Sequence, residues 1–130
     1  MANESLKHKI LIVEDDVAIM QVLAKRLERE GFEVSQAVDG IEGLDKAMKE
    51  RPDLILLDII MPRMDGFSVL KQLREDSGWG SKVQVMLLTN LGQEEDVSLG
   101  KEYGAIDYLV KSDWKIGDVV KKVKTKLVGN

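Results

Sequence analysis

The chain has 130 residues, a formal net charge of −4 at pH 7, 44% hydrophobic residues, 32% charged residues and no cysteine. This length predicts a single domain, and the lack of cysteine excludes disulfides, cysteine nucleophiles and thiolate metal sites. The acidic balance disfavours direct nucleic-acid binding, and no apolar run approaches the roughly 20 residues of a membrane span, so we expect a cytoplasmic protein without membrane insertion.

The first part of the chain predicts three strand–helix units. Residues 10–13 and 54–57 are apolar at consecutive positions, which is typical of strands covered on both faces of a parallel sheet. Residues 34–38 mix apolar and polar side chains and are predicted to form an edge strand. Each run precedes an amphipathic stretch, and the apolar helical faces are formed by Met20, Leu23 and Leu27, by Ile41, Leu44 and Met48, and by Phe67, Leu70 and Leu73.

The second part predicts two further units. Residues 83–88 form a buried strand, and residues 106–110, which carry polar side chains, form the second edge strand. The helix between them, over residues 93–103, is the weakest, because Gly100 costs about 1 kcal/mol relative to alanine. We expect that helix to be marginal and mobile. The last helix has the clearest pattern, with apolar side chains at Ile116, Val119, Val120, Val123 and Leu127.

Five alternating strand–helix units predict an α/β domain with a parallel sheet, right-handed crossovers and helices on both faces. If the two polar strands are the edges, the strand order is 2-1-3-4-5, the flavodoxin-like doubly wound (βα)5 arrangement. We therefore predict one domain over residues 1–130, with frayed ends at residues 1–8 and 129–130.

Carboxylates gather at the predicted ligand-binding edge of this sheet. Ligands of such folds bind beyond the carboxyl ends of the strands, where the winding reverses between the first and third strands. Glu14, Asp15 and Asp16 follow the first strand and Asp58 ends the third. Asp16 is predicted to be a helix N-cap. The other carboxylates would repel one another and raise at least one pKa, unless a hard cation such as Mg²⁺ binds them.

A hydroxyl and an ammonium end the other two strands. Thr89 follows the fourth strand and Lys111 the fifth. Either residue alone is usually structural or solvated, but both fall at the same end of the sheet as the carboxylates. A metal, a hydroxyl and a lysine together suit a phosphoryl group. Asp65, just before Gly66, is a candidate cap for the following helix.

These residues carry a family resemblance. Residues 10–16, 56–66, 88–89 and 104–111 resemble the receiver domain of bacterial two-component response regulators, including single-domain chemotaxis-type proteins. The likeness extends over residues 9–127, and the block from Asp58 to Gly66 is its most specific part.

The resemblance implies that Asp58 accepts a phosphoryl group from a phosphohistidine of a sensor histidine kinase or a histidine phosphotransfer protein. It also implies Mg²⁺ as the cofactor. Asp15 and Asp58 would bind the ion directly, Glu14 through water, and Ile60 through its backbone carbonyl. Such a receiver is not classed as an enzyme, because it catalyses only its own phosphoryl transfer and slow dephosphorylation.

By the same resemblance, Thr89 and Lys111 bind the phosphoryl oxygens and Tyr108 is the switch aromatic. Phosphorylation adds roughly −1.5 to −2 charge, and the implied output is a changed surface over the fourth helix, the fifth strand and the fifth helix. A downstream protein target, or a second copy in a phosphorylation-dependent dimer, would read that surface.

Some positions depart from the family pattern. Ser112 stands where a proline usually follows the lysine, which opens the question of a cis or trans Lys111–Ser112 bond, and Asn90 replaces a small residue. Ile60 and Leu91 flank the implied path of the hydrolytic water and cannot orient it, so we predict a long-lived phosphoaspartate.

Two other classes of function compete with this interpretation. A receiver-like protein-binding module that works without phosphorylation is kept open by Ser112 and Asn90. A flavodoxin-like redox protein or a phosphatase is disfavoured, because carboxylates follow the first strand in place of a phosphate-binding loop, and a further acid or base is missing.

Overall fold

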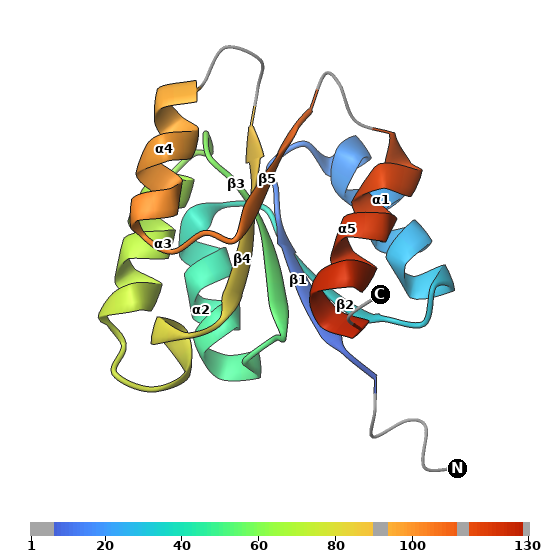
Figure 1. The fold of residues 1–130 in the computed structure, drawn as a ribbon, viewed down its shortest axis with the longest axis horizontal. Helices are drawn as coiled ribbons and strands as arrows, with labels where there is room; N and C mark the ends of the chain where they lie inside the picture. Colours follow the sequence, from blue (N-terminus) through green and yellow to red (C-terminus); the bar gives the residue numbers. More distant parts are fainter. Residues whose placement is uncertain (1–6, 90–93, 112–114, 129–130) are drawn as a thin grey trace.

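A computed structural model describes residues 7–89, 94–111 and 115–128. Its five parallel strands form one sheet in the order β2-β1-β3-β4-β5 (Figure 1), which confirms the predicted topology. The strands are β1 (Lys9–Val13), β2 (Glu33–Ala37), β3 (Leu54–Asp58), β4 (Gln84–Thr89) and β5 (Asp107–Val110).

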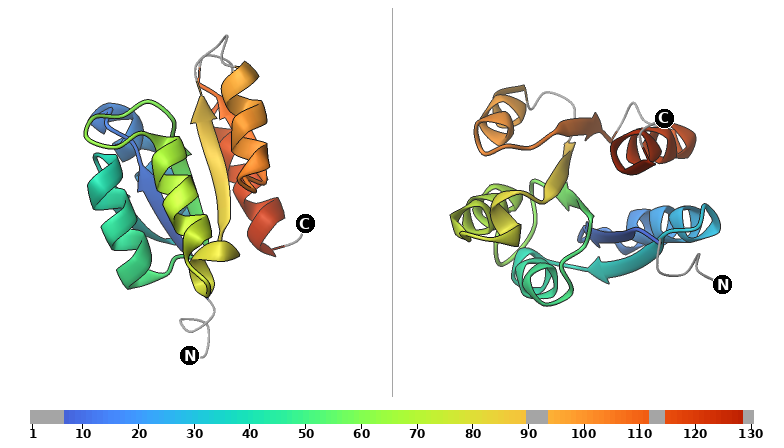
Figure 2. Two further views of the ribbon diagram at one scale, coloured as in Figure 1. Left: turned by 90° about the vertical axis from the view of Figure 1, so that its left-hand side faces the viewer. Right: turned by 60° about the horizontal axis from the view of Figure 1, so that its bottom comes forward.

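Helices cover both faces of the sheet, as Figure 2 shows. Two helices lie on one face and three on the other. Within the described ranges, no helix is long and apolar enough to cross a membrane. On the first face lie α1 (Val17–Arg29) and α5 (Ile116–Val128); on the second lie α2 (Gly40–Glu50), α3 (Gly66–Glu75) and α4 (Glu94–Glu102), and a short 3-10 turn, η2 (Trp79–Ser81), follows α3.

The buried strands supply side chains to two separate cores. Ile10 and Ile12 of β1 belong to the core beneath α1 and α5, whereas Leu11 and Val13 belong to the core on the opposite face. This alternation explains the unbroken apolar runs, because a strand covered on both faces has no solvent-facing position. The outer strands β2 and β5 are only partly buried, as predicted for edges.

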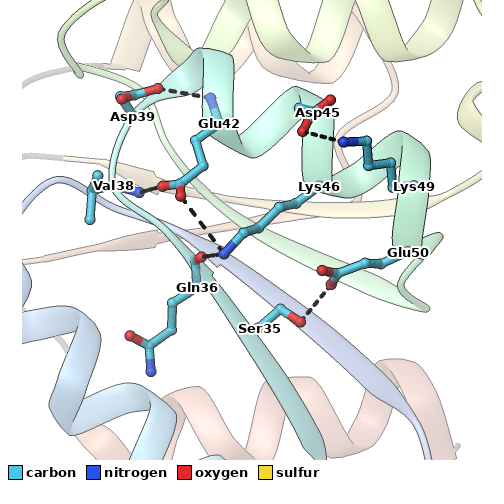
Figure 3. A network of polar contacts seen from close by, with 9 residues as sticks. All are labelled: Ser35, Gln36, Val38, Asp39, Glu42, Asp45, Lys46, Lys49 and Glu50. Atoms are coloured by element: carbon cyan, nitrogen blue, oxygen red, sulfur yellow. Dashed lines mark hydrogen bonds and ion pairs between the residues drawn. The ribbon is translucent and has the colours of Figure 1, made fainter.

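Helix α2 is tied to the edge strand β2 by side chains. Lys46 Nζ donates to the Gln36 carbonyl at 2.5 Å, and Ser35 Oγ donates to Glu50 Oε1 at 2.6 Å (Figure 3). These contacts tie α2 to β2, the strand that pairs with β1.

The register aligns the ends of the central strands. Val13 of β1 pairs with Leu57 of β3, so the residues that follow, Glu14 and Asp58, reach the carboxyl edge of the sheet together. Two helices begin there at the predicted caps: Asp16 accepts from the Ile19 N–H at 3.1 Å, and Asp65 from the Ser68 N–H at 2.8 Å.

Helix α4 packs closely on the sheet through Gly100. A Cβ at this position would clash with Leu87 Cδ1 of β4. The glycine that weakens the helix by propensity therefore allows its close approach to β4. The predicted mobility of this helix stays a prediction.

Candidate functional site at the carboxyl edge of the sheet

Three carboxylates meet where β1 and β3 end. Glu14, Asp15 and Asp58 each offer an oxygen, and these oxygens lie within 4.8 Å of one another. Glu14 is 0% exposed and Asp58 is 3% exposed, whereas Asp15 is open to solvent. The cluster predicted from the sequence is thus present, with one exposed and two buried members.

Lys111 supplies the positive charge of this cluster from the end of β5. Its Nζ lies 2.7 Å from Glu14 Oε1 and 3.1 Å from Asp58 Oδ2. A single ammonium therefore bridges two buried carboxylates. Because one cation cannot neutralise both, the buried part of the site keeps an excess of negative charge.

This imbalance shifts the proton equilibria of the site. Burial raises the pKa of Asp58 to about 7, the charge of Glu14 acts in the same direction, and Lys111 opposes both effects. Burial alone would lower the pKa of Lys111, but its contacts with Glu14 and Asp58 outweigh burial and raise it. The lysine therefore stays charged at neutral pH, while the Asp58 carboxyl is poised to gain or lose a proton.

The donor set fits a hard divalent cation. Within the described residues, Glu14 Oε1 makes no hydrogen bond of good geometry beyond its ion pair, and Glu14 Oε2 accepts from the Asp16 N–H at 3.0 Å. Glu14 is therefore held by the protein, and Asp15 is the open carboxylate. Carboxylate oxygens with access to water are the ligands that Mg²⁺ prefers.

The chain after Asp58 turns tightly into α3. The Gly66 N–H donates to the Ile59 carbonyl at 2.7 Å, and the Ile59 N–H donates to the Leu88 carbonyl at 3.2 Å. A Cβ at Gly66 would clash with the Asp58 carbonyl oxygen, so this position requires glycine. Ile60 lies in this loop and is 58% exposed.

The other predicted site residues occupy different surroundings. Thr89 ends β4 opposite Val110, and the structure describes only its backbone. Tyr108 lies exposed on β5, with Lys101 Nζ of α4 5.6 Å from the centre of its ring. Three further residues named from the sequence lie outside the described residues: Asn90, Leu91 and Ser112. The Lys111–Ser112 bond, for which cis and trans forms were considered, lies outside them as well.

One ion pair near the site was not anticipated. Arg63, in the loop after Asp58, pairs with Asp39 at the start of α2, with 3.3 Å between Nε and Oδ2. The two residues are distant in sequence, and neither belongs to a helical or strand pattern. No periodic signal could have joined them.

Comparison with known proteins agrees with this geometry. The profile of the response regulator receiver domain matches residues 10–124. Among curated proteins, the chain is 46% identical over 103 residues to the DNA-binding dual master transcriptional regulator RpaA of Synechocystis, covering 79% of this chain and 42% of RpaA. It is 43% identical over 106 residues to the alkaline phosphatase synthesis transcriptional regulatory protein PhoP of Bacillus subtilis, covering 82% of this chain and 43% of PhoP. The chain thus spans less than half the length of these two relatives.

Solved structures show the same likeness over nearly the whole chain. The chemotaxis protein CheY4 of Vibrio cholerae is 34% identical with a TM-score of 0.85, covering 93% of this chain and 99% of CheY4. A CheY-like receiver domain protein of Methanospirillum hungatei is 32% identical with a TM-score of 0.86, and the match covers 95% of each chain.

Proposed function

The chain belongs to the family of response regulator receiver domains, and we propose that it accepts a phosphoryl group on Asp58 in the presence of Mg²⁺. The observation that carries this proposal is the buried Asp58 carboxylate, held between an ammonium and two further carboxylates. The donor class is a phosphohistidine on a sensor histidine kinase or a histidine phosphotransfer protein.

The transfer step uses the charges of the site. An Asp58 oxygen attacks phosphorus, the P–N bond of the phosphohistidine breaks, and the imidazole leaves with the bonding electron pair and takes up a proton. Lys111, beside Asp58, binds an oxygen of the transferred group and stabilises its charge. Glu14, Asp15, Asp58 and the Ile60 carbonyl would hold Mg²⁺, which supplies further charge neutralisation when bound.

The output would arise from the side of the molecule that carries Tyr108. We assign the Thr89 hydroxyl to the phosphoryl group and the Tyr108 ring to the switch between states. The contact of Lys101 with that ring supports this assignment, because it joins α4 to β5 at the surface. A protein target, or a second copy of the chain, would then read the altered surface over α4, β5 and α5.

The relatives differ in how they use such a domain. RpaA is described as DNA-binding, and CheY4 as a chemotaxis protein. For this chain we propose a cytoplasmic receiver whose output passes to a protein partner, without direct contact to nucleic acid. The net charge of −4 supports this choice, since an acidic chain is poorly matched to a phosphate backbone.

The hydrolysis of the phosphoaspartate is expected to be slow. The exposed Ile60 side chain lies two residues after Asp58 and has no group that could orient water, and Leu91 is apolar as well. Replacing Ile60 with asparagine should shorten the half-life of the phosphorylated protein severalfold, measured by intact mass after removal of the donor. An unchanged half-life would contradict this role of Ile60.

The proposed function is tested by intact mass spectrometry after incubation with acetyl phosphate and Mg²⁺. One added phosphoryl group is expected on the parent protein and on Asp107→Asn, a control distant from the site, and none on Asp58→Asn. A phosphohistidine protein serves as the second donor. If neither donor modifies the parent, the proposal fails in favour of a protein-binding module that works without phosphorylation.

A further inference from the structure

We propose that the Asp39–Arg63 ion pair is a positioning device for the metal site, holding the loop after Asp58 in a strained turn. The inference rests on the proposed function, because it assumes that this loop contributes the Ile60 carbonyl to Mg²⁺ binding. Neither residue belongs to the acidic cluster, so both act through the backbone between them and the site.

The turn at Arg63 is strained. Arg63 has a φ of 69°, in the left-handed region that side chains other than glycine rarely adopt. The Met64 N–H donates to the Pro62 carbonyl at 2.8 Å, which closes a three-residue turn with Arg63 at its centre. A positive φ at the centre of such a turn corresponds to the γ-turn form that is rare and strained. Strained backbone persists only where its surroundings hold it.

Asp39 holds the turn from the adjoining strand–helix unit. Its Oδ2 lies 3.3 Å from Arg63 Nε. Its Oδ1 accepts from the Glu42 N–H at 2.8 Å at the start of α2, as Figure 3 shows. Glu42 in turn accepts from the Val38 N–H at 2.8 Å. Asp39 is only 13% exposed in its side chain, whereas Arg63 is 57% exposed. The carboxylate is therefore the fixed partner, and the arginine is the group that it holds.

The backbone of α2 supports the turn from the same direction. A Cβ at Gly40 would clash with the Met64 carbonyl oxygen, so the first turn of α2 lies directly against the loop. On the other side, Gln72 Nε2 approaches Met64 Sδ at 3.7 Å, a weak contact. The charged contact with Asp39 thus acts on a segment already confined by the start of α2.

The Asp39–Arg63 ion pair acts on the middle of the loop, between its two hydrogen-bonded ends. The hydrogen bonds of Ile59 with Leu88 and Gly66 fix the two ends of the loop. Between them lies the segment 60–64, which contains the proposed carbonyl ligand and the strained turn. If Arg63 is released, the turn relaxes toward negative φ and the segment shifts. Asp58 itself stays in β3, so the cation loses one ligand while the phosphoacceptor is retained.

Two substitutions distinguish a positioning role of Arg63 from a long-range electrostatic effect of its charge on Mg²⁺ binding. Arg63→Gln and Arg63→Gly remove the same positive charge and the same ion pair, but only glycine adopts positive φ without strain. Positioning predicts that Arg63→Gln weakens Mg²⁺ binding by about tenfold, in the range found for residues that orient metal ligands. It predicts that Arg63→Gly binds Mg²⁺ nearly as tightly as the parent. A purely electrostatic role predicts that both variants bind the cation equally, and more tightly than the parent.

The measurement is isothermal titration of Mg²⁺ into each protein, with thermal unfolding in EDTA to verify that each variant is folded. Asp39→Asn is the matched partner variant, because asparagine keeps the helix cap and removes only the ion pair. It should weaken Mg²⁺ binding, and adding Arg63→Gly to it should restore the affinity. As a kinetic readout, Arg63→Gln should raise the Mg²⁺ concentration for half-maximal phosphorylation by acetyl phosphate and leave the maximal rate within about twofold.

The outcomes distinguish this inference from the proposed function. If the parent binds Mg²⁺ and is phosphorylated on Asp58, while Arg63→Gln equals Arg63→Gly, only the positioning role is overturned. If the parent binds no Mg²⁺ and takes up no phosphoryl group, the proposed function fails and this inference fails with it.

Discussion

Two aspartate–lysine pairs in this protein have nearly the same length and opposite consequences. Asp58 and Lys111 are 3.1 Å apart at the carboxyl edge of the sheet, and Asp107 and Lys122 are 3.0 Å apart at the amino end of β5. Burial raises the pKa of Asp58 to about 7. Burial also acts to raise the pKa of Asp107, but the Lys122 hydrogen bond, the Tyr108 N–H and the lysine charges lower it below its ordinary value.

The difference comes from the charges around each pair. Asp107 has two ammonium groups nearby, since Lys126 Nζ lies 3.7 Å from the same oxygen that binds Lys122. Among the described residues, Lys111 is the one ammonium that pairs with Asp58, and it also pairs with the buried Glu14. Asp107 thus has two described ammonium groups for one carboxylate, whereas the candidate site has one ammonium group for two buried carboxylates. A bound divalent cation would supply the missing positive charge, which a transferring phosphoryl group, itself negative, also requires.

The largest effect is expected when Lys111 is replaced by methionine, with the same substitution at Lys122 as the matched control. Lys111→Met leaves two buried carboxylates without a cation and should lower the free energy of unfolding by about 3 kcal/mol at pH 8 in EDTA. Lys122→Met, at the surface, should cost less than about 1 kcal/mol. Urea denaturation measures both values, and equal costs would show that the two pairs are equivalent.

Replacing Asp58 with asparagine should stabilise the metal-free protein at high pH. Because the folded pKa of Asp58 is about 7 against an ordinary 3.8, the folded state binds the extra proton and loses stability as the pH rises between these values. The asparagine side chain does not titrate, so the variant should exceed the parent by on the order of 3 kcal/mol above pH 7. The gap should close below pH 4 in denaturation curves. A gap independent of pH would refute the raised pKa.

Mg²⁺ should stabilise the protein more at pH 8 than at pH 5. A proton on Asp58 competes with the cation at the lower pH, whereas the carboxylate is free to bind it at the higher one. With Mg²⁺ at about 100 times its dissociation constant, the gain at pH 8 is about 2–3 kcal/mol, seen as a rise in the melting temperature. The Asp15→Asn variant should lose most of this gain. An equal gain in stability at both pH values would show that the cation does not bind the Asp58 carboxylate.

The smallest effect is expected at the second pair. The pKa of Asp107 is lowered, so its contribution to stability is present above the ordinary value of 3.8 and is lost as the pH falls below it. Asp107→Asn should cost less than about 1 kcal/mol at pH 7, and this cost should shrink as the pH falls below 3.8. A larger loss of stability that persists at acid pH would indicate that Asp107 contributes through packing and not through its charge.

Much of the fold follows from local patterns. The largely apolar runs of β1, β3 and β4 and the mixed runs of β2 and β5 were enough to predict the strand order, because burial on one or two faces is visible in single segments. Boundaries shifted by a residue: the strand predicted over residues 34–38 is Glu33–Ala37. The gathering of Glu14, Asp58 and Lys111 was predictable as well, since parallel strands end at one edge.

The unpredicted contacts join segments with no common period. The guanidinium of Arg74 donates to the carbonyls of Gly80, Tyr103 and Gly104, at 2.8, 2.9 and 3.0 Å. These carbonyls belong to turns whose positions depend on the assembled sheet and helices. A charged side chain that binds backbone oxygens leaves no sequence pattern at its partners. The Asp39–Arg63 pair was missed for a different reason, because its two side chains come from separate loops with no common period.

The glycines around the site have a consequence for mutational tolerance. Loops and the helix ends beside them usually accept substitutions more readily than buried strands. Here Gly40 lies against the Met64 carbonyl and Gly66 against the Asp58 carbonyl, with no room for a methyl group. In a saturation library of this chain, these two helix-start positions should therefore be as intolerant as the interior of β3. A map of tolerated substitutions would outline the loops around Asp58 as sharply as it outlines the core.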